Sequence, residues 1–374
     1  MFTLLQPLLF LPQTIITFFR IIKTKENMSN TQVYFRKVPT TYPVNGEHIE
    51  VVKTPFSADT VELADGDFLI KNLVLSVDPY MRGRMRNQTK KSYSPAFAID
   101  AVLNGAGVSV VLRSKNENFK AGDYVYGLIG WEEYTVVRAA MAGSFQLRNE
   151  AKDSGLPISN YIGVLGMPGM TAYIGLYKFA NMKAGETLFV SAAAGAVGQL
   201  VGQIGKINGL HVVGSVGDDS KAKYLIDECD FDAVFNYKTT NVAEGLAEHC
   251  PNGVDIYFEN VGGKTLEAVI DAANNFARIV VCGMISQYNL ENPEPVHNLV
   301  QIIGKRIRME GFIVGDSAAE YRPAFVKDVT TWLKEGKIQY KEDVAVGIEN
   351  APEAFIGMLK GKNFGKQVVK IADA

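Results

Sequence analysis

The chain has few residues of the kinds that build metal centres and disulfide frameworks. Its 374 residues include only 3 Cys and 4 His, and no C-x-x-C, H-E-x-x-H or similar ligand spacing occurs among them. Three scattered cysteines cannot form a disulfide scaffold, which favours a reducing compartment such as the cytoplasm. We therefore expect no metal site, and we interpret His249 and Cys250 as surface or core side chains because adjacent residues are poorly placed to share one ion.

An excess of charge of either sign is also absent. The sequence has 38 basic and 40 acidic residues, for a formal net charge of -2. This balance gives no reason to expect a nucleic acid or an acidic surface as a partner. Apolar residues at 47% and charged residues at 21% are typical of a globular protein, and the length suggests two domains.

An apolar stretch lies at the beginning of the chain and is unsuited to crossing a membrane. Pro7, Pro12 and several polar residues interrupt it, which disfavours a spanning helix. A basic leader region and a small-residue cleavage site, which mark a signal peptide, are not evident. We expect residues 1–27 to be an extension outside the folded core, with no stable membrane insertion, and the folded protein to begin near Met28.

The rest of the chain has two different patterns of expected secondary structure. Residues 33–137 contain short strand-like runs such as 104–114, separated by Gly, Asp and Asn, which predicts a mostly antiparallel β domain. From about residue 156 strands and helices alternate, which predicts a parallel, doubly wound sheet. The C-terminal tail returns to strand character. We expect one domain from residues 28–155 and 335–374, and a second from 156–334.

A small-residue turn, VSAAAGAVGQLVGQIGK (residues 190–206), joins an expected strand to an expected helix. The positions of the G-x-G-x-x-G fingerprint are occupied by Ala193, Gly195 and Gly198. Gly195 would let a pyrophosphate approach the backbone, and the helix N-terminus would offer it N–H groups. Ala193 requires only a turn without a positive φ at that position. Small residues also suit simple packing of a helix on a sheet, so the turn alone is weak evidence.

The end of the following strand bears on the choice of nucleotide. Asp218 and Asp219 come directly after it and could either bind ribose hydroxyls or cap the next helix. We favour the cap, because the pair opens a helical segment. Lys221 suits a ribose 2′-phosphate, which would indicate NADP, although it could also lie on a solvated helix face.

Motifs along the chain resemble one known family. The stretch from VSAAAGAVGQLVGQIGK to DDSKAKYL, together with SVDPYMRGRM, YFENVGG, CGMISQYN and AFIGMLKGKNFGK, is similar to the zinc-independent medium-chain dehydrogenase/reductases. The likeness is to their leukotriene B4 12-hydroxydehydrogenase, prostaglandin reductase and alkenal double-bond reductase branch. It implies a GroES-like domain around a Rossmann domain, NADPH as cofactor, a homodimer, and a cytoplasmic location with the nucleus as an alternative. Where zinc-binding relatives carry a Cys ligand, SVDPYMRG has neither Cys nor His.

The resemblance also assigns residues to the cofactor. It implies that the pyrophosphate loop is formed by Gly195, Ala196, Val197 and Gly198. Lys221 and Tyr237 match the positions that contact the 2′-phosphate. Further matching positions along the cofactor are Asn260, Cys282, Gly283, Met284, Ile285, Ser286, Gln287, Tyr288, Phe312, Ile313, Val314 and Asn363.

The activity implied is NADPH-dependent reduction of the carbon–carbon double bond of an α,β-unsaturated aldehyde or ketone. Hydride would reach the β carbon, and negative charge would collect on the carbonyl oxygen as an enolate. A hydrogen-bond donor at that oxygen lowers the barrier. Tyr288, which follows a Rossmann strand, is the best candidate. Tyr80 is a second candidate that could equally line the wall of the site, and we interpret Arg82, Arg84 and Arg86 as surface or interface charges.

Other functions remain compatible with the sequence. The chain could be a quinone reductase of the same superfamily, or an alcohol dehydrogenase that works in the oxidative direction. It could also bind NADPH without catalysis, as a structural or sensing protein. The resemblance implies a small-molecule enal or enone as the substrate but does not identify the compound.

Overall fold

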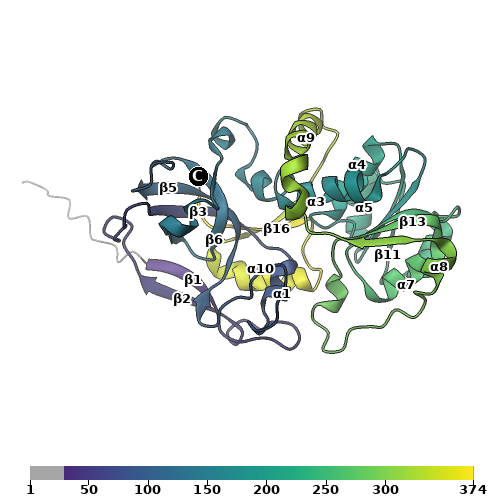
Figure 1. Ribbon diagram of the computed structural model, residues 1–374, viewed down its shortest axis with the longest axis horizontal. Coiled ribbons are helices and arrows are strands. Elements are labelled where there is room, and N and C mark those ends of the chain that lie inside the picture. Colours follow the sequence, from purple (N-terminus) through teal and green to yellow (C-terminus); the bar gives the residue numbers. More distant parts are fainter. Residues whose placement is uncertain (1–28, 374) are drawn as a thin grey trace, which may run out of the picture.

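The computed structural model describes residues 29–373; the extension expected at residues 1–27 lies outside them. Two lobes lie side by side along the long axis of the molecule (Figure 1). One contains mostly antiparallel sheets and the other a parallel sheet with helices on both faces. The predicted fold class is confirmed. Within residues 29–373, no helix has both the length and the apolarity needed to cross a membrane.

The β lobe is built from two sheets. The larger has the strand order β15-β16-β3-β5-β6-β8 with β7 paired to β3, and the smaller has the order β2-β1-β4. The strands are β1 (Ser29–Phe35), β2 (Ile49–Pro55), β3 (Phe68–Ser76), β4 (Ala101–Val102), β5 (Asn104–Ser114), β6 (Tyr124–Gly130), β7 (Tyr134–Val137), β8 (Gln146–Leu147), β15 (Glu342–Val346) and β16 (Lys366–Lys370). The helices are α1 (Tyr80–Arg84), α2 (Ala139–Ala142) and α10 (Ala351–Leu359). Strand β16 runs antiparallel to β3, so the end of the chain lies in a sheet made mainly by its beginning.

The second lobe is a parallel sheet in the order β11-β10-β9-β12-β13-β14. Its strands are β9 (Thr187–Val190), β10 (His211–Val216), β11 (Ala233–Asn236), β12 (Val254–Glu259), β13 (Ala273–Val281) and β14 (Arg308–Gly311). The chain winds outward in one direction from β9 and then in the other from β12. In open parallel sheets the crevice for ligands forms at this reversal, outside the carboxyl ends of the strands.

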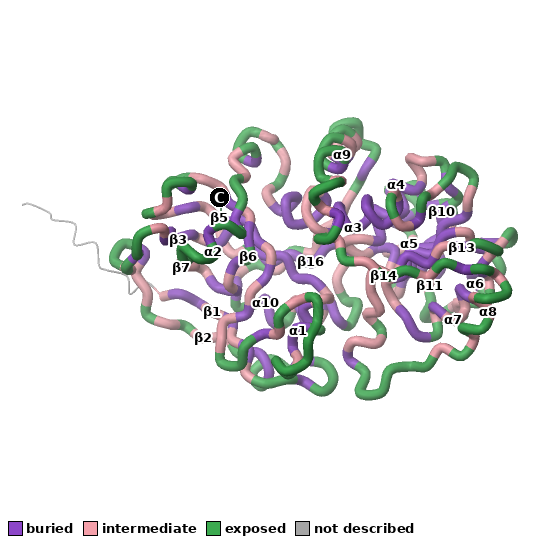
Figure 2. The backbone as a smooth tube through the Cα atoms, viewed as in Figure 1, coloured by how far each residue is buried: buried purple, intermediate pink, exposed green. Residues whose placement is uncertain are grey.

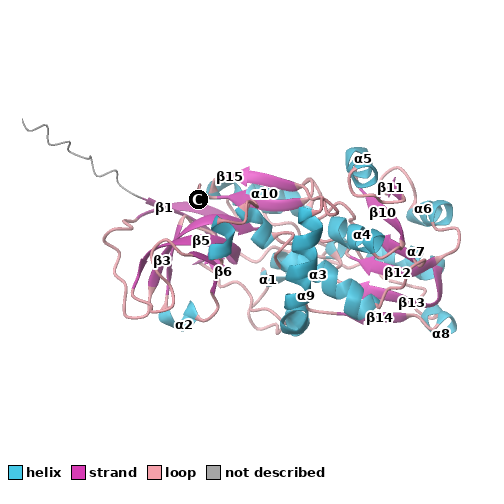
Figure 3. Cartoon of the chain, turned by 90° about the horizontal axis from the view of Figure 1, so that it is seen from above, coloured by secondary structure: helices cyan, strands magenta, loops and turns pink. Residues whose placement is uncertain are grey.

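Helices cover both faces of the parallel sheet because its strands are apolar on both sides (Figures 2 and 3). Leu188 and Val190 on β9 join a core with α3, α4 and α9. The residue between them, Phe189, joins the opposite core with α6, α7 and α8, as the alternation of side chains along a strand requires. The helices are α3 (Met167–Ile174), α4 (Gly198–Ile207), α5 (Asp219–Asp227), α6 (Val242–His249), α7 (Gly263–Ala272), α8 (Gln301–Lys305) and α9 (Gly315–Lys334). Short helical turns span Asn149–Lys152, Ile158–Ile162, Gly175–Ala180, Ile285–Gln287 and Ile348–Asn350.

A buried ion pair joins β16 to the end of β3. The Lys366 Nζ lies 3.0 Å from Asp78 Oδ1, and the two side chains are 3% and 5% exposed. The same ammonium donates to the carbonyl oxygens of Val77 and Gln367 at 2.9 and 3.0 Å, and Ser76 Oγ donates to Asp78 Oδ2 at 2.5 Å. These hydrogen bonds offset the cost of removing two charges from water.

We expect Lys366→Met to lower the free energy of unfolding by about 3–5 kcal/mol, because Asp78 would keep a buried charge without its partner. Chemical denaturation followed by fluorescence measures the change. Lys370→Met is the matched control, since the Lys370 side chain, on the same strand, is 46% exposed and pairs at the surface with Asp373; we expect less than about 1 kcal/mol there. Equal losses in the two variants would contradict the prediction.

Candidate functional site

A cavity of about 910 Å³ lies between the two lobes, a size suited to a cofactor and a small substrate. One wall is formed by the segments that follow β9, β10, β12, β13 and β14 in the parallel sheet. The opposite wall comes from α1, β6 and the region around α10. The cavity therefore lies where the strand order of the parallel sheet reverses.

The small-residue turn forms the part of the cavity next to α4. A Cβ on Gly198 would lie 2.5 Å from the carbonyl oxygen of Ala192, so only glycine fits there. The amides of Val197 and Gly198 have no acceptor among residues 29–373, and both residues line the cavity. Free N–H groups at the start of a ten-residue helix attract an anion such as phosphate. Ala193 has no positive φ, as expected, and the left-handed residue is its neighbour Ala192, at φ +48°.

The segment after β10 shows whether Asp218 and Asp219 line the cavity or open the next helix. Asp218 caps α5, with its side chain accepting from the Ser220 amide at 2.9 Å. Asp219 accepts from Asn236 Nδ2 at 2.7 Å. Neither aspartate lines the cavity, so the interpretation as helix-opening residues is confirmed.

Lys221 and Tyr237 line the same end of the cavity. The Lys221 Nζ donates to the carbonyl oxygen of Gly361 at 2.8 Å, and burial lowers the pKa of its ammonium. The Tyr237 side chain is nearby, since a Cβ on Gly217 would lie 2.7 Å from its hydroxyl oxygen. A cation and a phenol beside an open glycine backbone make this end suitable for a phosphate group.

The loop from Cys282 to Tyr288 is held against the end of β12. The amides of Cys282 and Gly283 donate to the backbone carbonyl of Glu259 at 2.9 and 3.0 Å, and the Ile285 amide donates to Asn260 at 3.0 Å. The buried Glu259 side chain in turn accepts from the amides of Val261 and Gly262, and burial raises the pKa of its carboxyl. The sequence analysis did not identify Glu259, whose side chain holds the turn at Val261 and Gly262, next to this loop.

Tyr288 ends that loop with its hydroxyl turned back toward Gly283. The Met284 amide donates to the Tyr288 Oη at 3.1 Å. The hydroxyl proton itself has no acceptor among residues 29–373, and Tyr288 lines the cavity. Burial raises the pKa of Tyr288, and the hydrogen bond from Met284 partly opposes this. The phenol is therefore neutral at pH 7 and has a proton to donate.

Tyr80 lines the cavity from the β lobe. It is the first residue of α1, and burial together with the negative charge of Asp78 raises the pKa of its phenol. Tyr93 and Tyr126 also line this part, and burial raises the pKa of Tyr126. The sequence offered no signal that singled these two out, because they lie on different segments of the β lobe.

Most of the predicted cofactor residues converge on this one cavity. The exceptions are Met284 and Gln287, which do not line it. Met284 contributes its amide to Tyr288, and the Gln287 side chain bonds to Glu294 at 3.2 Å. The predicted residues that line the cavity, besides Tyr80, are Gly195, Ala196, Val197, Gly198, Lys221, Tyr237, Asn260, Cys282, Gly283, Ile285, Ser286, Tyr288, Phe312, Ile313, Val314 and Asn363.

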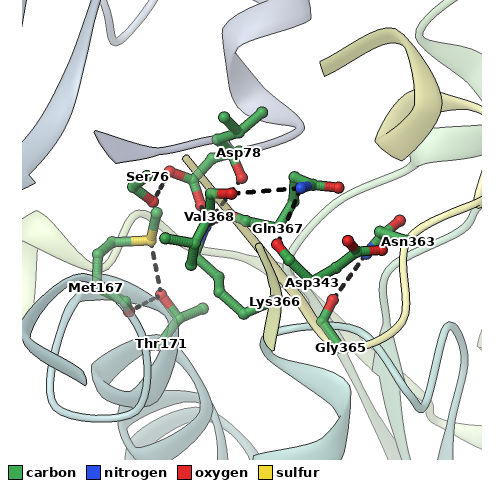
Figure 4. Close-up of polar contacts among 11 residues, drawn as sticks. Ser76, Asp78, Met167, Thr171, Asp343, Asn363, Gly365, Lys366, Gln367 and Val368 are labelled. Carbon is green, nitrogen blue, oxygen red and sulfur yellow. Dashed lines mark hydrogen bonds and ion pairs between the residues drawn. The ribbon is translucent and has the colours of Figure 1, made fainter. Parts of the chain in front are cut away.

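The C-terminal segment lines the cavity with Asn363, Gly365 and Gln367, and Figure 4 shows the polar contacts of these residues. Asn363 Nδ2 donates to the Gly365 carbonyl at 2.7 Å, and Gly365 forms an isolated β-bridge with Gly195 of the small-residue turn. The next residue is the buried Lys366. A Cβ on Gly365 would lie 2.0 Å from the Lys341 carbonyl, so the close passage requires glycine here.

The interpretation of Arg82 and Arg84 as surface or interface charges is wrong. They are 7% and 4% exposed. The Arg84 guanidinium lies 3.9 Å from the centre of the Phe97 ring and donates to the Pro95 carbonyl at 3.0 Å. Both belong to a one-turn helix covered by loops from other parts of the chain, so alternation along the sequence carries no information about their burial. Arg86 is partly buried.

No nucleophile or metal cluster stands out among residues 29–373. Burial raises the pKa of the Cys282 thiol to about 12, so this cavity residue is protonated at pH 7. No group of three or more His, Cys, Asp or Glu side chains is placed to hold a metal ion in the described part of the chain. The free amides at α4, the cation at Lys221 and the neutral phenols fit a dinucleotide and an uncharged substrate.

Comparisons with known proteins agree with this arrangement. Residues 31–144 match a family described as the N-terminal domain of oxidoreductase, and residues 196–330 match one described as zinc-binding dehydrogenase. The chain is 47% identical over 348 residues to the NADP(+)-dependent 2-alkenal reductase of Nicotiana tabacum, which covers 93% of this chain and 99% of the relative. It is 43% identical over 320 residues to prostaglandin reductase 1 of Rattus norvegicus, covering 84% and 93%.

A solved structure is similar over nearly the same span. The crystal structure of CurA from Vibrio vulnificus in complex with NADPH is 40% identical to the chain, with a TM-score of 0.83. The likeness covers 92% of this chain and 100% of that one.

Proposed function

The chain belongs to the zinc-independent medium-chain dehydrogenase/reductases, in the branch of the alkenal and prostaglandin reductases, and we propose from this that it is an enzyme of the 2-alkenal reductase type. It is an NADP-dependent oxidoreductase. The reaction is the reduction of the carbon–carbon double bond of α,β-unsaturated aldehydes or ketones. The observation that carries the proposal is the Tyr288 hydroxyl, which accepts from Met284 and keeps its own proton free beside the cavity.

The nucleotide is held mainly by backbone groups. The amides of Val197 and Gly198 and the start of α4 bind the pyrophosphate, and Lys221 with Tyr237 binds the 2′-phosphate. Asn260 and Cys282 also line the cavity, directly after β12 and β13. When bound, the cofactor supplies the hydride.

Tyr288 acts on the other end of the conjugated system. As the β carbon is reduced, negative charge gathers on the carbonyl oxygen, and the neutral phenol donates a hydrogen bond to it. The Met284 amide, bonded to the phenol oxygen at 3.1 Å, polarises that hydroxyl and makes it a stronger donor. Tyr80, on the opposite wall, is a second neutral donor. The buried surroundings strengthen both interactions because they exclude water.

The proposed activity is tested by following NADPH oxidation with a panel of alkenals, enones, quinones and saturated alcohols, the last with NADP(+). We expect turnover on alkenals or enones, with the saturated carbonyl compound identified by mass spectrometry. Binding of NADPH without turnover on any of them would favour a non-catalytic protein. Faster turnover on quinones, or alcohol oxidation alone, would favour the other two enzymes.

We expect Tyr288→Phe to lower kcat for an enone by about 10²–10³-fold, the cost of one lost oxyanion donor, with the affinity for NADPH nearly unchanged. Steady-state kinetics and fluorescence titration separate the two. Tyr34→Phe is the control, because Tyr34 lies on β1, outside the cavity, and its hydroxyl donates to Gln32 at 3.3 Å. An unchanged kcat in Tyr288→Phe would assign the donor role to another group.

We expect Lys221→Ala to raise the KM for NADPH by about tenfold or more, since hydrogen bonds to charged groups contribute about 1.5–3 kcal/mol. The KM for NADH should change little, because NADH lacks the 2′-phosphate. Lys223→Ala is the matched control, two residues along the same helix, with a 78% exposed side chain paired with Asp227. An equal rise for NADPH and NADH would contradict the assignment.

A further inference from the structure

Arg82 is a buried cation that reaches across the cleft between the lobes. Its side chain lies on α1, and the residue is 7% exposed. The Nε donates to Asn289 Oδ1 at 2.8 Å. One terminal nitrogen donates to the carbonyl oxygens of Pro39 and Thr41 at 3.1 and 2.8 Å. Among residues 29–373 no carboxylate forms an ion pair with it, and the acceptors of its hydrogen bonds are neutral.

Asn289 is the partner on the parallel-sheet side, directly after Tyr288 in the chain. It is 4% exposed. Its Oδ1 receives the Arg82 hydrogen bond, whereas its Nδ2 is buried with no hydrogen-bond partner among the described residues. The oxygen alone therefore accounts for the polar contacts of this side chain.

The contacts of Arg82 adjoin three tyrosines of the cavity. Tyr80 lies two residues before Arg82, Tyr42 follows Thr41, and Tyr288 precedes Asn289. All three tyrosines line the cavity. One guanidinium thus ties two segments of the β lobe, which carry Tyr42 and Tyr80, to the segment of the facing wall that carries Tyr288.

Other links between the lobes lie at the nucleotide end. Gln203 Nε2 donates to the Gln339 carbonyl at 2.8 Å, and Lys221 donates to Gly361. Gly195 and Gly365 form a β-bridge. These contacts run through the C-terminal segment, whereas the Arg82–Asn289 hydrogen bond joins the segments that carry Tyr80 and Tyr288.

We propose that Arg82 and Asn289 are positioning residues: Arg82, from the β lobe, holds Asn289, and Asn289 holds the neighbouring Tyr288 with its hydroxyl at the substrate carbonyl. The proposal rests on the proposed enone reduction. Backbone hydrogen bonds to the Glu259–Val261 turn hold the loop as far as Ser286. Directly after Tyr288, the hydrogen bond from Arg82 to Asn289 holds the chain again. A planar guanidinium can serve acceptors in three directions at fixed angles, which a lysine ammonium on a flexible stem cannot reproduce. Displacement of a reacting group by about 1 Å can cost about 10²-fold in rate.

The decisive variants are at Asn289. We expect Asn289→Ala to lower kcat for an enone about tenfold, with less than a threefold change in the KM values, as a misplaced donor requires. Asn289→Asp keeps an acceptor oxygen for the Arg82 guanidinium and replaces the unpartnered Nδ2 with a second, charged oxygen that also pairs with it, so we expect kcat within about threefold of the wild type.

Arg82→Met should lower kcat to a similar extent, and the double variant Arg82→Met/Asn289→Ala should lose no more than Arg82→Met alone. Arg113→Met is the matched control: this arginine donates to the carbonyls of Ala58 and Val61 within the β lobe, so any loss of stability there should leave kcat unchanged. Multiplying losses in the double variant, or failure of Asn289→Asp to restore kcat, would overturn the proposal.

Hydrogen–deuterium exchange of the cofactor-free protein gives a readout that does not depend on activity. We expect faster exchange in residues 283–290 in Asn289→Ala and Arg82→Met, and wild-type exchange there in Arg113→Met and Asn289→Asp. Unchanged exchange in Asn289→Ala would overturn the positioning role. If the wild type reduces no enone while the exchange result holds, the proposed function fails and the structural tie stands.

Discussion

The buried pair of Lys366 and Asp78 is the contact on which both walls of the cavity depend. Lys366 follows Gly365, which bridges to Gly195 in the nucleotide turn. Asp78 lies two residues before Tyr80, at the start of the opposite wall. Because the ammonium also binds two backbone carbonyls in the same place, the end of β3 and the start of β16 keep one relative position. The β lobe therefore fixes the segment that contacts the nucleotide turn relative to the segment that leads to Tyr80.

Elements with a repeating pattern could be predicted from the sequence. The apolar run at residues 187–193 contains β9, and the helical periodicity from Val197 to Ile207 matches α4 almost to the residue. The cap at Asp218 was also readable, because its hydrogen bond reaches only two residues along the chain. The long helix α9 runs from Gly315 to Lys334 with Pro323 inside it, and because proline usually ends a helix, its full length could not be predicted from the sequence.

Features that depend on distant segments could not be predicted. Arg82 was expected to be a surface or interface charge. Its burial is decided by residues 39–41 and by Asn289, which lies 207 positions away. Glu259 was likewise part of a recognised motif, YFENVGG, yet only the structure shows that its carboxylate closes the turn at Val261 and Gly262. Motif matching located the cavity residues, whereas the groups that hold them in place appeared only from the packing.

The two halves of the cavity are held in different ways, and this separates cofactor binding from substrate choice. The nucleotide half depends on helix amides, on glycines that a Cβ would bring into contact with neighbouring backbone, and on the C-terminal segment, so few substitutions fit there. The substrate half depends on tyrosines tied by one guanidinium, and its rim includes Tyr93 and Leu128, which are 63% and 40% exposed. No contact of Arg82 reaches these two residues. Substitutions at the rim can therefore alter which conjugated carbonyl compound enters without moving the Tyr288 hydroxyl or the nucleotide turn.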